Sequence, residues 1–169
     1  MKTAPPTKTN AARLLDSLGI RYELRPYVVD PDDLTAISVA RKIGLPPEQV
    51  FKTLLTQTNT GDHLFAVIPG DVELDLKKLA HAANAKKVEL ASLKEVEPLT
   101  GYIRGGVTVM GAKKPFPAYA DETIELFDII SVSAGQRGLQ LILSPTDYLR
   151  ATKAIIAELT KSDLTKGSA

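Results

Sequence analysis

QVFKTLL (residues 49–55) and HLFAVIPG (residues 63–70) are two short apolar segments, separated by a polar turn that contains the sequence NTGD. Side chains alternate between the two faces of a strand, and both faces of the first segment are mostly apolar, which is typical of a strand covered on both sides. The Asn, Gly and Asp of the turn favour a hairpin between the two segments. We therefore predict a β-hairpin, in which Lys52 is the one charged residue of residues 49–55.

Lys52 is unusual in this position because a buried ammonium group is unfavourable unless it is paired or takes part in chemistry. One interpretation is that the residue lies near a strand end and extends its amine to water. The other is that the amine projects into a functional pocket. The residues around Lys52 leave both interpretations open.

Helical patterns surround this hairpin. Residues 9–19 begin with a capping Thr9 or Asn10 and end at Gly19, which is a common helix terminator. In residues 92–95 the sequence SLKE forms a capping box from Ser92 and Glu95. The other predicted helices cover residues 34–44, closed by Gly44, residues 74–84, capped by Asp75, and residues 144–159, capped by Ser144 with Pro145 and Asp147 in the first turn.

Further strands are predicted at residues 20–27 and 86–91, and residues 128–143 form a second hairpin around AGQRG. The total of about six or seven strands, with frequent hairpins, argues against a doubly wound parallel sheet. We predict an α/β fold with a mixed, barrel-like β-sheet surrounded by helices. Residues 1–169 form a single domain, in which residues 1–8 and 161–169 are expected to be loose tails.

The composition excludes several classes of function. The chain has 169 residues, 21 Lys plus Arg against 20 Asp plus Glu, and no cysteine. A net charge of +1 provides no overall attraction for nucleic acid, so such binding would need a local patch. Without cysteine there is no disulfide, thiolate nucleophile or zinc–thiolate site. The N-terminal residues lack the apolar core of a signal peptide and no segment is long enough to span a membrane, so we expect a cytoplasmic protein.

TGYIRGGVTVMG (residues 100–111) is too rich in glycine to be regular throughout. A phosphate-binding P-loop would need Lys directly after the second glycine and then Ser or Thr, but Ala112 and Lys114 disrupt that pattern. Two interpretations remain. The amides of Gly101, Gly105 and Gly106 form an anion-binding nest, or the segment is an ordinary glycine-rich turn.

Few other residues suggest chemistry. The only two histidines, His63 and His81, have no second ligand at useful spacing, so we expect no metal and no cofactor. No G-x-S-x-G nucleophile motif is present. The cationic pairs are either solvated faces or parts of one phosphate-binding patch; they are Lys77–Lys78, Lys86–Lys87 and Lys113–Lys114, with Arg137 in the second hairpin turn.

Six segments, in this order, resemble the YbaK/EbsC family of aminoacyl-tRNA deacylases: VFKTLL, LDLKKLA, AKKVELA, TGYIRGG, GAKK and SAGQRGLQL. The resemblance runs from about Asn10 to Leu159. The family is related to the editing insertion of bacterial prolyl-tRNA synthetases. The resemblance therefore implies a trans-editing enzyme that cleaves the ester of mischarged tRNA, with Cys-tRNA(Pro) as the main expected substrate and Cys-tRNA(Cys) as a further one, and with prolyl-tRNA synthetase as a partner.

The resemblance also implies roles for individual residues. Lys52 matches the active-site lysine of the family, and Gly105 and Gly106 match the catalytic glycine loop. The cysteine thiol of the substrate would attack its own ester, so the protein needs no nucleophile. Substrate-binding positions are Tyr27, Gly101, Tyr102, Thr108, Arg137 and Gln140, and the tRNA backbone would contact Lys113 and Lys114.

The sequence departs from the family pattern at two places. Thr108 and Val109 stand where YbaK-type chains commonly carry Ser-Pro, and neutral Gln140 stands where they commonly carry an aspartate. The loss of that acid puts amino-acid selectivity in doubt, because it could pair with the substrate ammonium or with Lys52. A deacylase for another small amino acid such as alanine, or a tRNA- or synthetase-binding module without hydrolysis, therefore remains an alternative.

Overall fold

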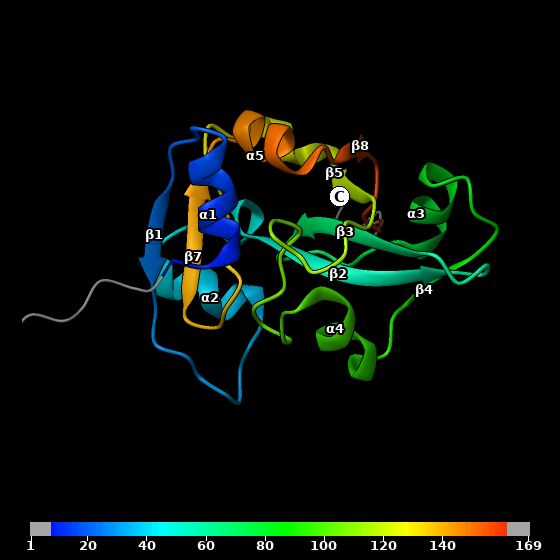
Figure 1. Cartoon of the computed structure of the whole chain (residues 1–169), viewed down its shortest axis with the longest axis horizontal. Helices are drawn as coiled ribbons and strands as arrows, with labels where there is room; N and C mark the ends of the chain where they lie inside the picture. Colours follow the sequence, from blue (N-terminus) through cyan, green and yellow to red (C-terminus); the bar gives the residue numbers. More distant parts are fainter. Residues whose placement is uncertain (1–7, 162–169) are drawn as a thin grey trace, which may run out of the picture.

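The computed structural model describes residues 8–161, which form two β-sheets with helices around them (Figure 1). The three-stranded sheet has the order β1-β7-β6, and the five-stranded sheet has the order β4-β2-β3-β5-β8. An isolated bridge between Val50 and Ser131 links the two sheets. The predicted tails fall almost wholly outside the described residues; Lys8 and Lys161, at the limits of the described part, form ion pairs with Asp16 and Glu73.

The elements have the following bounds. The strands are β1 (Glu23–Pro26), β2 (Phe51–Thr58), β3 (His63–Pro69), β4 (Val88–Leu90), β5 (Ala118–Asp121), β6 (Ile130–Ser133), β7 (Leu139–Leu143) and β8 (Ile155–Ala157). The helices are α1 (Asn10–Ser17), α2 (Ala36–Ile43), α3 (Leu76–Ala82), α4 (Leu93–Thr100) and α5 (Pro145–Thr152), with the short 3-10 helices η1 (Pro47–Gln49) and η2 (Glu122–Leu126).

The hairpin predicted from residues 49–70 is confirmed and lies in the centre of the larger sheet. β2 and β3 pair in antiparallel register, and Lys52 is opposite Ile68. Both faces of β3 are buried, since Phe65, Ala66 and Val67 have no exposed surface. In Figure 1, α5 lies on one side of this hairpin and α4 on the other.

Local capping explains why the helices begin and end where they do. The Thr9 side chain accepts a hydrogen bond from the Ala12 amide, and Asp75 accepts from the amides at the start of α3. The capping box predicted for Ser92 and Glu95 is present, and Gly44 ends α2 in the left-handed conformation. These predictions rest on interactions within one helical turn, and all are confirmed.

The last predicted helix is wrong in its second half. α5 ends at Thr152, and Lys153 has a left-handed φ of 55°. Residues 155–157 instead form β8, which pairs in parallel with β5. The β-branched pair Ile155–Ile156 suits a strand, and the sheet partner overrides the helical pattern.

The fold class is α/β with mixed pairing, as predicted, but the sheet count differs. Residues 8–161 contain eight strands rather than six or seven, because neither β5 nor β8 was predicted. The strands form two sheets that do not close among the described residues, so a barrel-like sheet is not confirmed. No helix in residues 8–161 has the length and apolar character needed to cross a membrane.

Candidate functional site

A cavity of about 720 Å³ opens beside the edge of β2 that faces away from β3. Its walls come from the start of α2, the segment after β3, the end of β4, α4 and the glycine-rich loop before β5. The lining residues are Leu34, Thr35, Ala36, Ile37, Val39, residues 50–55, residues 70–73, Leu90, Ala91, Leu93, Val96, Arg104, Gly105, Val107, Ser133 and Gln140. Most of these side chains are apolar, as is usual for a small-ligand pocket.

Lys52 lines this cavity, which favours the pocket interpretation of the residue. The side chain is half-buried, and its Nζ atom donates a hydrogen bond to the Gly70 carbonyl oxygen at 3.4 Å. Burial lowers the pKa of the Lys52 ammonium, while the carboxylates of Glu73 and Asp71 act in the opposite direction. The charge of Lys52 is therefore poorly hydrated and is available to a negatively charged group in the cavity.

Of the three glycines predicted to bind an anion, Gly105 lies in the cavity wall. Gly105 lines the cavity with a φ of +87°. The Gly106 amide donates to the Ile103 carbonyl at 2.8 Å, and the Gly101 amide donates to the Glu97 carbonyl at the end of α4. A nest made from all three amides is therefore not formed, because two of them are already engaged within the protein.

Gly106 has a packing role that requires glycine. A Cβ atom at this position would lie 2.9 Å from the Cα atom of Gln136 in the turn between β6 and β7. Arg137 in the same turn donates from Nε to the Arg104 carbonyl at 2.8 Å. The β6–β7 turn thus holds the loop that carries Arg104 and Gly105 against the cavity.

Gln140 lies at the buried end of the cavity. It has 5% exposure, and its Oε1 atom accepts a hydrogen bond from the Ser131 hydroxyl at 2.7 Å. Ser133 lines the cavity beside it, and its hydroxyl accepts from the Gly135 amide. The departure from the family pattern at Gln140 therefore places a neutral amide in the cavity wall.

The other predicted substrate-binding residues do not line the cavity. Burial raises the pKa of Tyr102 to about 12, and its hydroxyl donates to the Met110 carbonyl. Thr108 is fully buried, and its hydroxyl has no partner in the described part of the chain. Tyr27 lies at the end of β1, where its amide donates to the Gly138 carbonyl. All three residues belong to the packing of the fold and do not line the cavity.

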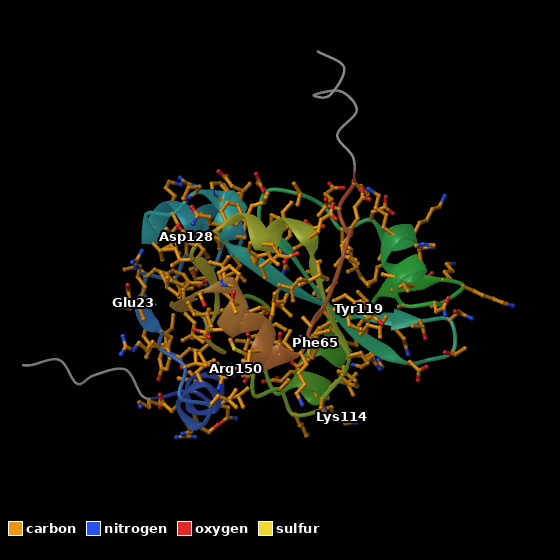
Figure 2. The ribbon with its side chains drawn as sticks, turned by 90° about the horizontal axis from the view of Figure 1, so that it is seen from above. Glu23, Phe65, Lys114, Tyr119, Asp128 and Arg150 are labelled. Atoms are coloured by element: carbon orange, nitrogen blue, oxygen red, sulfur yellow. The ribbon has the colours of Figure 1, made fainter. Side chains whose placement is uncertain are left out.

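The predicted tRNA-contacting lysines lie outside the cavity. Lys113 and Lys114 are exposed, and Figure 2 shows Lys114 at the outer surface of the molecule. Arg104 is the exposed cation that lines the cavity itself. Among residues 8–161, no three His, Asp or Glu side chains converge to hold a metal ion.

Sequence reasoning missed several residues of the cavity. Asp71 and Glu73 follow β3 directly, and the hairpin register that places Lys52 opposite Ile68 could have located them. Leu90 and Leu93 are exposed apolar residues at the wall formed by β4 and α4. Their position depends on the pairing of β4 with β2, which no local pattern reports.

Comparison with known proteins identifies the family of the chain. Residues 30–151 match the model of the aminoacyl-tRNA editing domain. The chain is 44% identical to the Enterococcus faecalis protein named "Putative Cys-tRNA(Pro)/Cys-tRNA(Cys) deacylase EbsC", over 92% of this chain and 95% of that protein. It is 27% identical to a proline–tRNA ligase of Pelobacter propionicus, over 66% of this chain and 19% of the ligase.

A solved structure extends the likeness to three dimensions. "Crystal structure of a putative trans-editing enzyme for prolyl tRNA synthetase" superposes with a TM-score of 0.78 at 25% identity, over 93% of this chain and 100% of that chain. The family match covers most of the described residues, including β2 with Lys52 and the glycine loop. The chain therefore belongs to the aminoacyl-tRNA editing domain family.

Proposed function

We propose that this protein is a trans-editing deacylase that cleaves the aminoacyl ester of mischarged tRNA, with Cys-tRNA(Pro) as its main substrate and Cys-tRNA(Cys) as a further one. The observation that carries the proposal is the half-buried ammonium of Lys52 in a mostly apolar cavity beside Gly105. The name of the E. faecalis relative and the family match support the same reaction.

The chemistry needs little from the protein because an aminoacyl ester is already reactive. The site has to hold the 3′ end of the tRNA, orient the carbonyl group and stabilise the negative charge that develops. The Lys52 ammonium can stabilise either the carbonyl oxygen or the departing ribose oxygen. The low-dielectric surroundings that lower the pKa of Lys52 also strengthen this interaction.

For a cysteinyl ester the substrate supplies the nucleophile. The thiol loses its proton, the sulfur forms a bond to the carbonyl carbon, and the carbon–oxygen bond to the ribose breaks. The ribose oxygen takes up a proton, which leaves free tRNA and a four-membered thiolactone that water then opens to cysteine. This route suits a chain without a cysteine and without a G-x-S-x-G motif.

The tRNA body contributes through a small number of surface cations. In this proposal Arg104 at the cavity binds a phosphate near the 3′ end, and the exposed Lys113 and Lys114 contact the tRNA backbone. A net charge of +1 offers little further attraction. We therefore propose prolyl-tRNA synthetase as the partner that presents the tRNA. We also propose the cytoplasm as the place of action.

A second candidate substrate follows from Gln140. With an amide instead of a carboxylate in the cavity wall, the pocket could accept another small amino acid such as alanine, whose ester would need a water nucleophile. A panel of Cys-tRNA(Pro), Ala-tRNA(Pro), Cys-tRNA(Cys) and Pro-tRNA(Pro) distinguishes a cysteinyl-tRNA deacylase from a deacylase for alanine. Rapid cleavage of both cysteinyl substrates, with Ala-tRNA(Pro) spared, supports thiol assistance. Cleavage of none of them, with or without prolyl-tRNA synthetase, refutes the proposed function.

A further inference from the structure

The edge of β2 that faces the cavity is a run of strand without a partner strand. β2 pairs with β3 from Phe51 to Gln57, but β4 covers the other edge only from Thr56 to Thr58. β6 approaches that edge through the isolated bridge between Val50 and Ser131. Within the described chain, residues 51–54 therefore have no ladder partner on this side, while the Leu55 carbonyl still accepts from the Ala91 amide, and residues 51–55 all line the cavity.

The register shows which peptide groups point toward the cavity. In an antiparallel pair, every second residue directs both its N–H and its C=O to the partner strand. Val50 accepts from the Gly70 amide and Thr58 donates to the Asp62 carbonyl, both at 2.8 Å, so the even-numbered residues face β3. Leu55 faces the other way, since its carbonyl accepts from the Ala91 amide.

Thr53 has the same orientation as Leu55 and lies in the middle of the unpaired run. Its N–H and C=O groups are therefore directed to the cavity side of the strand. The residue is partly exposed, although its side-chain hydroxyl is fully buried. The exposed part of Thr53 thus includes atoms other than that hydroxyl, as a peptide group open to the cavity requires.

We infer that the peptide of Thr53 binds the aminoacyl group of the substrate as if that group were one residue of an added strand. The Thr53 C=O accepts a hydrogen bond from the substrate α-ammonium, and the Thr53 N–H donates to the oxygen of the ester carbonyl. An α-amino acid carries its donor and acceptor at the spacing of a strand residue, so one residue can satisfy both groups. This inference rests on the proposed deacylase function and adds a second donor to that of Lys52.

The charges in the cavity support this arrangement. Gln140 is neutral and Glu73 is engaged with Lys161 at 2.9 Å, while Asp71, the other carboxylate of the cavity wall, acts on the Lys52 ammonium. A backbone carbonyl on the unpaired edge adds an acceptor for the substrate ammonium. The Thr53 N–H belongs to the peptide bond that joins Thr53 to Lys52. The N–H donor and the Lys52 side chain therefore start from neighbouring positions on the strand. The site would then hold any α-amino acid by its main-chain groups and leave selectivity to other residues.

The test removes the Thr53 N–H without changing the ladder to β3. Thr53→Pro lacks the N–H, and proline is tolerated on a strand edge whose N–H faces outward. Thr53→Val keeps the peptide and loses only the hydroxyl, so the ratio of the two rates isolates the N–H. With Cys-tRNA(Pro), we expect kcat of Thr53→Pro to be about 10²-fold below that of Thr53→Val, as for other donors to an oxyanion.

A second form of the test does not depend on tolerance of proline. The α-hydroxy analogue of threonine at position 53 replaces the N–H with an ester oxygen and keeps the side chain. It should also lower kcat relative to wild type. A substrate without the α-amino group, 3-mercaptopropionyl-tRNA(Pro), should lose most of its acceleration over spontaneous hydrolysis.

The outcomes separate the two proposals. If wild-type protein cleaves Cys-tRNA(Pro) but the α-hydroxy variant, or a folded Thr53→Pro, matches the kcat of its reference protein, the role of the Thr53 amide is overturned. If the desamino substrate is accelerated as strongly as Cys-tRNA(Pro), the role of the carbonyl is overturned. If the wild type cleaves no substrate of the panel, the deacylase function itself fails, and this inference fails with it.

Discussion

The Nζ atom of Lys52 lies 3.4 Å from the carbonyl oxygen of Gly70, the residue that follows the strand paired with β2. Gly70 leaves no room for a side chain, since a Cβ atom there would lie 2.6 Å from the Cβ of Ala36 and 2.8 Å from the Val50 carbonyl oxygen. This close approach brings the start of α2 and residues 71–73 against β2. It thereby builds the wall of the cavity beside the Lys52 amine.

Replacement of Lys52 should abolish most deacylation while the protein stays folded. Removal of one electrostatic contact to a developing negative charge typically lowers the rate by about 10²–10³-fold, and we expect this loss for Lys52→Ala. Lys52→Arg should restore little, because a planar guanidinium does not replace a compact ammonium in a confined pocket. The measurement is kcat with Cys-tRNA(Pro), together with thermal unfolding of each variant.

The matched control is Lys94→Ala, which removes an exposed lysine of α4 that does not line the cavity. It should retain the wild-type rate. A Lys52→Ala protein with near wild-type activity would falsify the assignment and return Lys52 to a snorkelling role at the strand end.

The lowered pKa of Lys52 predicts how stability depends on pH. Because burial lowers this pKa on folding, the unfolded chain binds more protons between the folded and unfolded pKa values, and this group makes stability rise with pH there. Lys52→Met removes the burial penalty, so it should be more stable than wild type at neutral pH. Its advantage should shrink as the pH rises through that window, and urea unfolding at a series of pH values checks this. A constant advantage at every pH would contradict the burial of the charge.

The parts of the fold that were predicted correctly depend on neighbours in sequence. The β2–β3 hairpin follows from a polar turn between two apolar segments, and α4 follows from its capping box. β5 and β8 could not be predicted in the same way. They pair in parallel with strands distant in sequence, and β8 consists of three residues that continue a helical pattern. Pairing with a remote strand decided their conformation.

The candidate site shows the same division. Lys52 was found because a charge in an apolar strand is conspicuous, and the structure places it at the cavity. The glycines were recognised because residues 100–111 are rich in glycine, but the role of each one depends on its contacts in the fold. Gly106 donates to Ile103 and packs on Gln136, whereas Gly105 faces the cavity. Arg104 was missed because a lone exposed arginine carries no local signal.

Alanine substitutions at the paired glycines should therefore have different effects. At Gly106 a Cβ would lie 2.9 Å from the Cα of Gln136, which is backbone and cannot easily move. We expect Gly106→Ala to lower the free energy of unfolding by about 1–3 kcal/mol, as overpacking does. At Gly105 the nearest atom would be the flexible Arg137 side chain at 3.3 Å, so strain comes mainly from its φ of +87°.

For Gly105→Ala we expect about 1–2 kcal/mol of destabilisation from the left-handed backbone. We also expect the deacylation rate to fall by more than this loss of stability alone would cause. Urea unfolding and deacylation rates measured on the two variants provide the comparison. A Gly106→Ala protein as stable as wild type would show that the β6–β7 turn does not pack on Gly106 as described.

Binding to tRNA should be weak and strongly dependent on the partner. With a net charge of +1, few phosphates are neutralised, so we expect a small dependence of affinity on salt. Arg104→Ala should raise KM for Cys-tRNA(Pro) more than it lowers kcat, because the exposed arginine at the cavity is proposed to bind a tRNA phosphate and not the reacting ester. Filter binding at several salt concentrations, with and without prolyl-tRNA synthetase, tests this. Nanomolar binding of uncharged tRNA at physiological salt without the synthetase would contradict it.

Gln140→Asp tests whether the cavity wall reads the amino acid. Gln140 has 5% exposure, and its Oε1 atom accepts from the Ser131 hydroxyl, a hydrogen bond that the aspartate, shorter by one methylene group, weakens or loses. The new charge would attract the substrate α-ammonium, so we expect the ratio of Cys-tRNA(Pro) to Ala-tRNA(Pro) cleavage to change. Burial should raise the pKa of the introduced carboxyl, and a group whose pKa is raised on folding loses its stabilising effect as the pH rises. The variant should therefore be less stable than wild type at neutral pH and approach the stability of wild type in mild acid.

Ser131→Ala, which removes the hydroxyl but adds no charge, is the control for lost hydrogen bonding. If the substrate ratio in Gln140→Asp equals that in Ser131→Ala, the charge at this position does not select the amino acid.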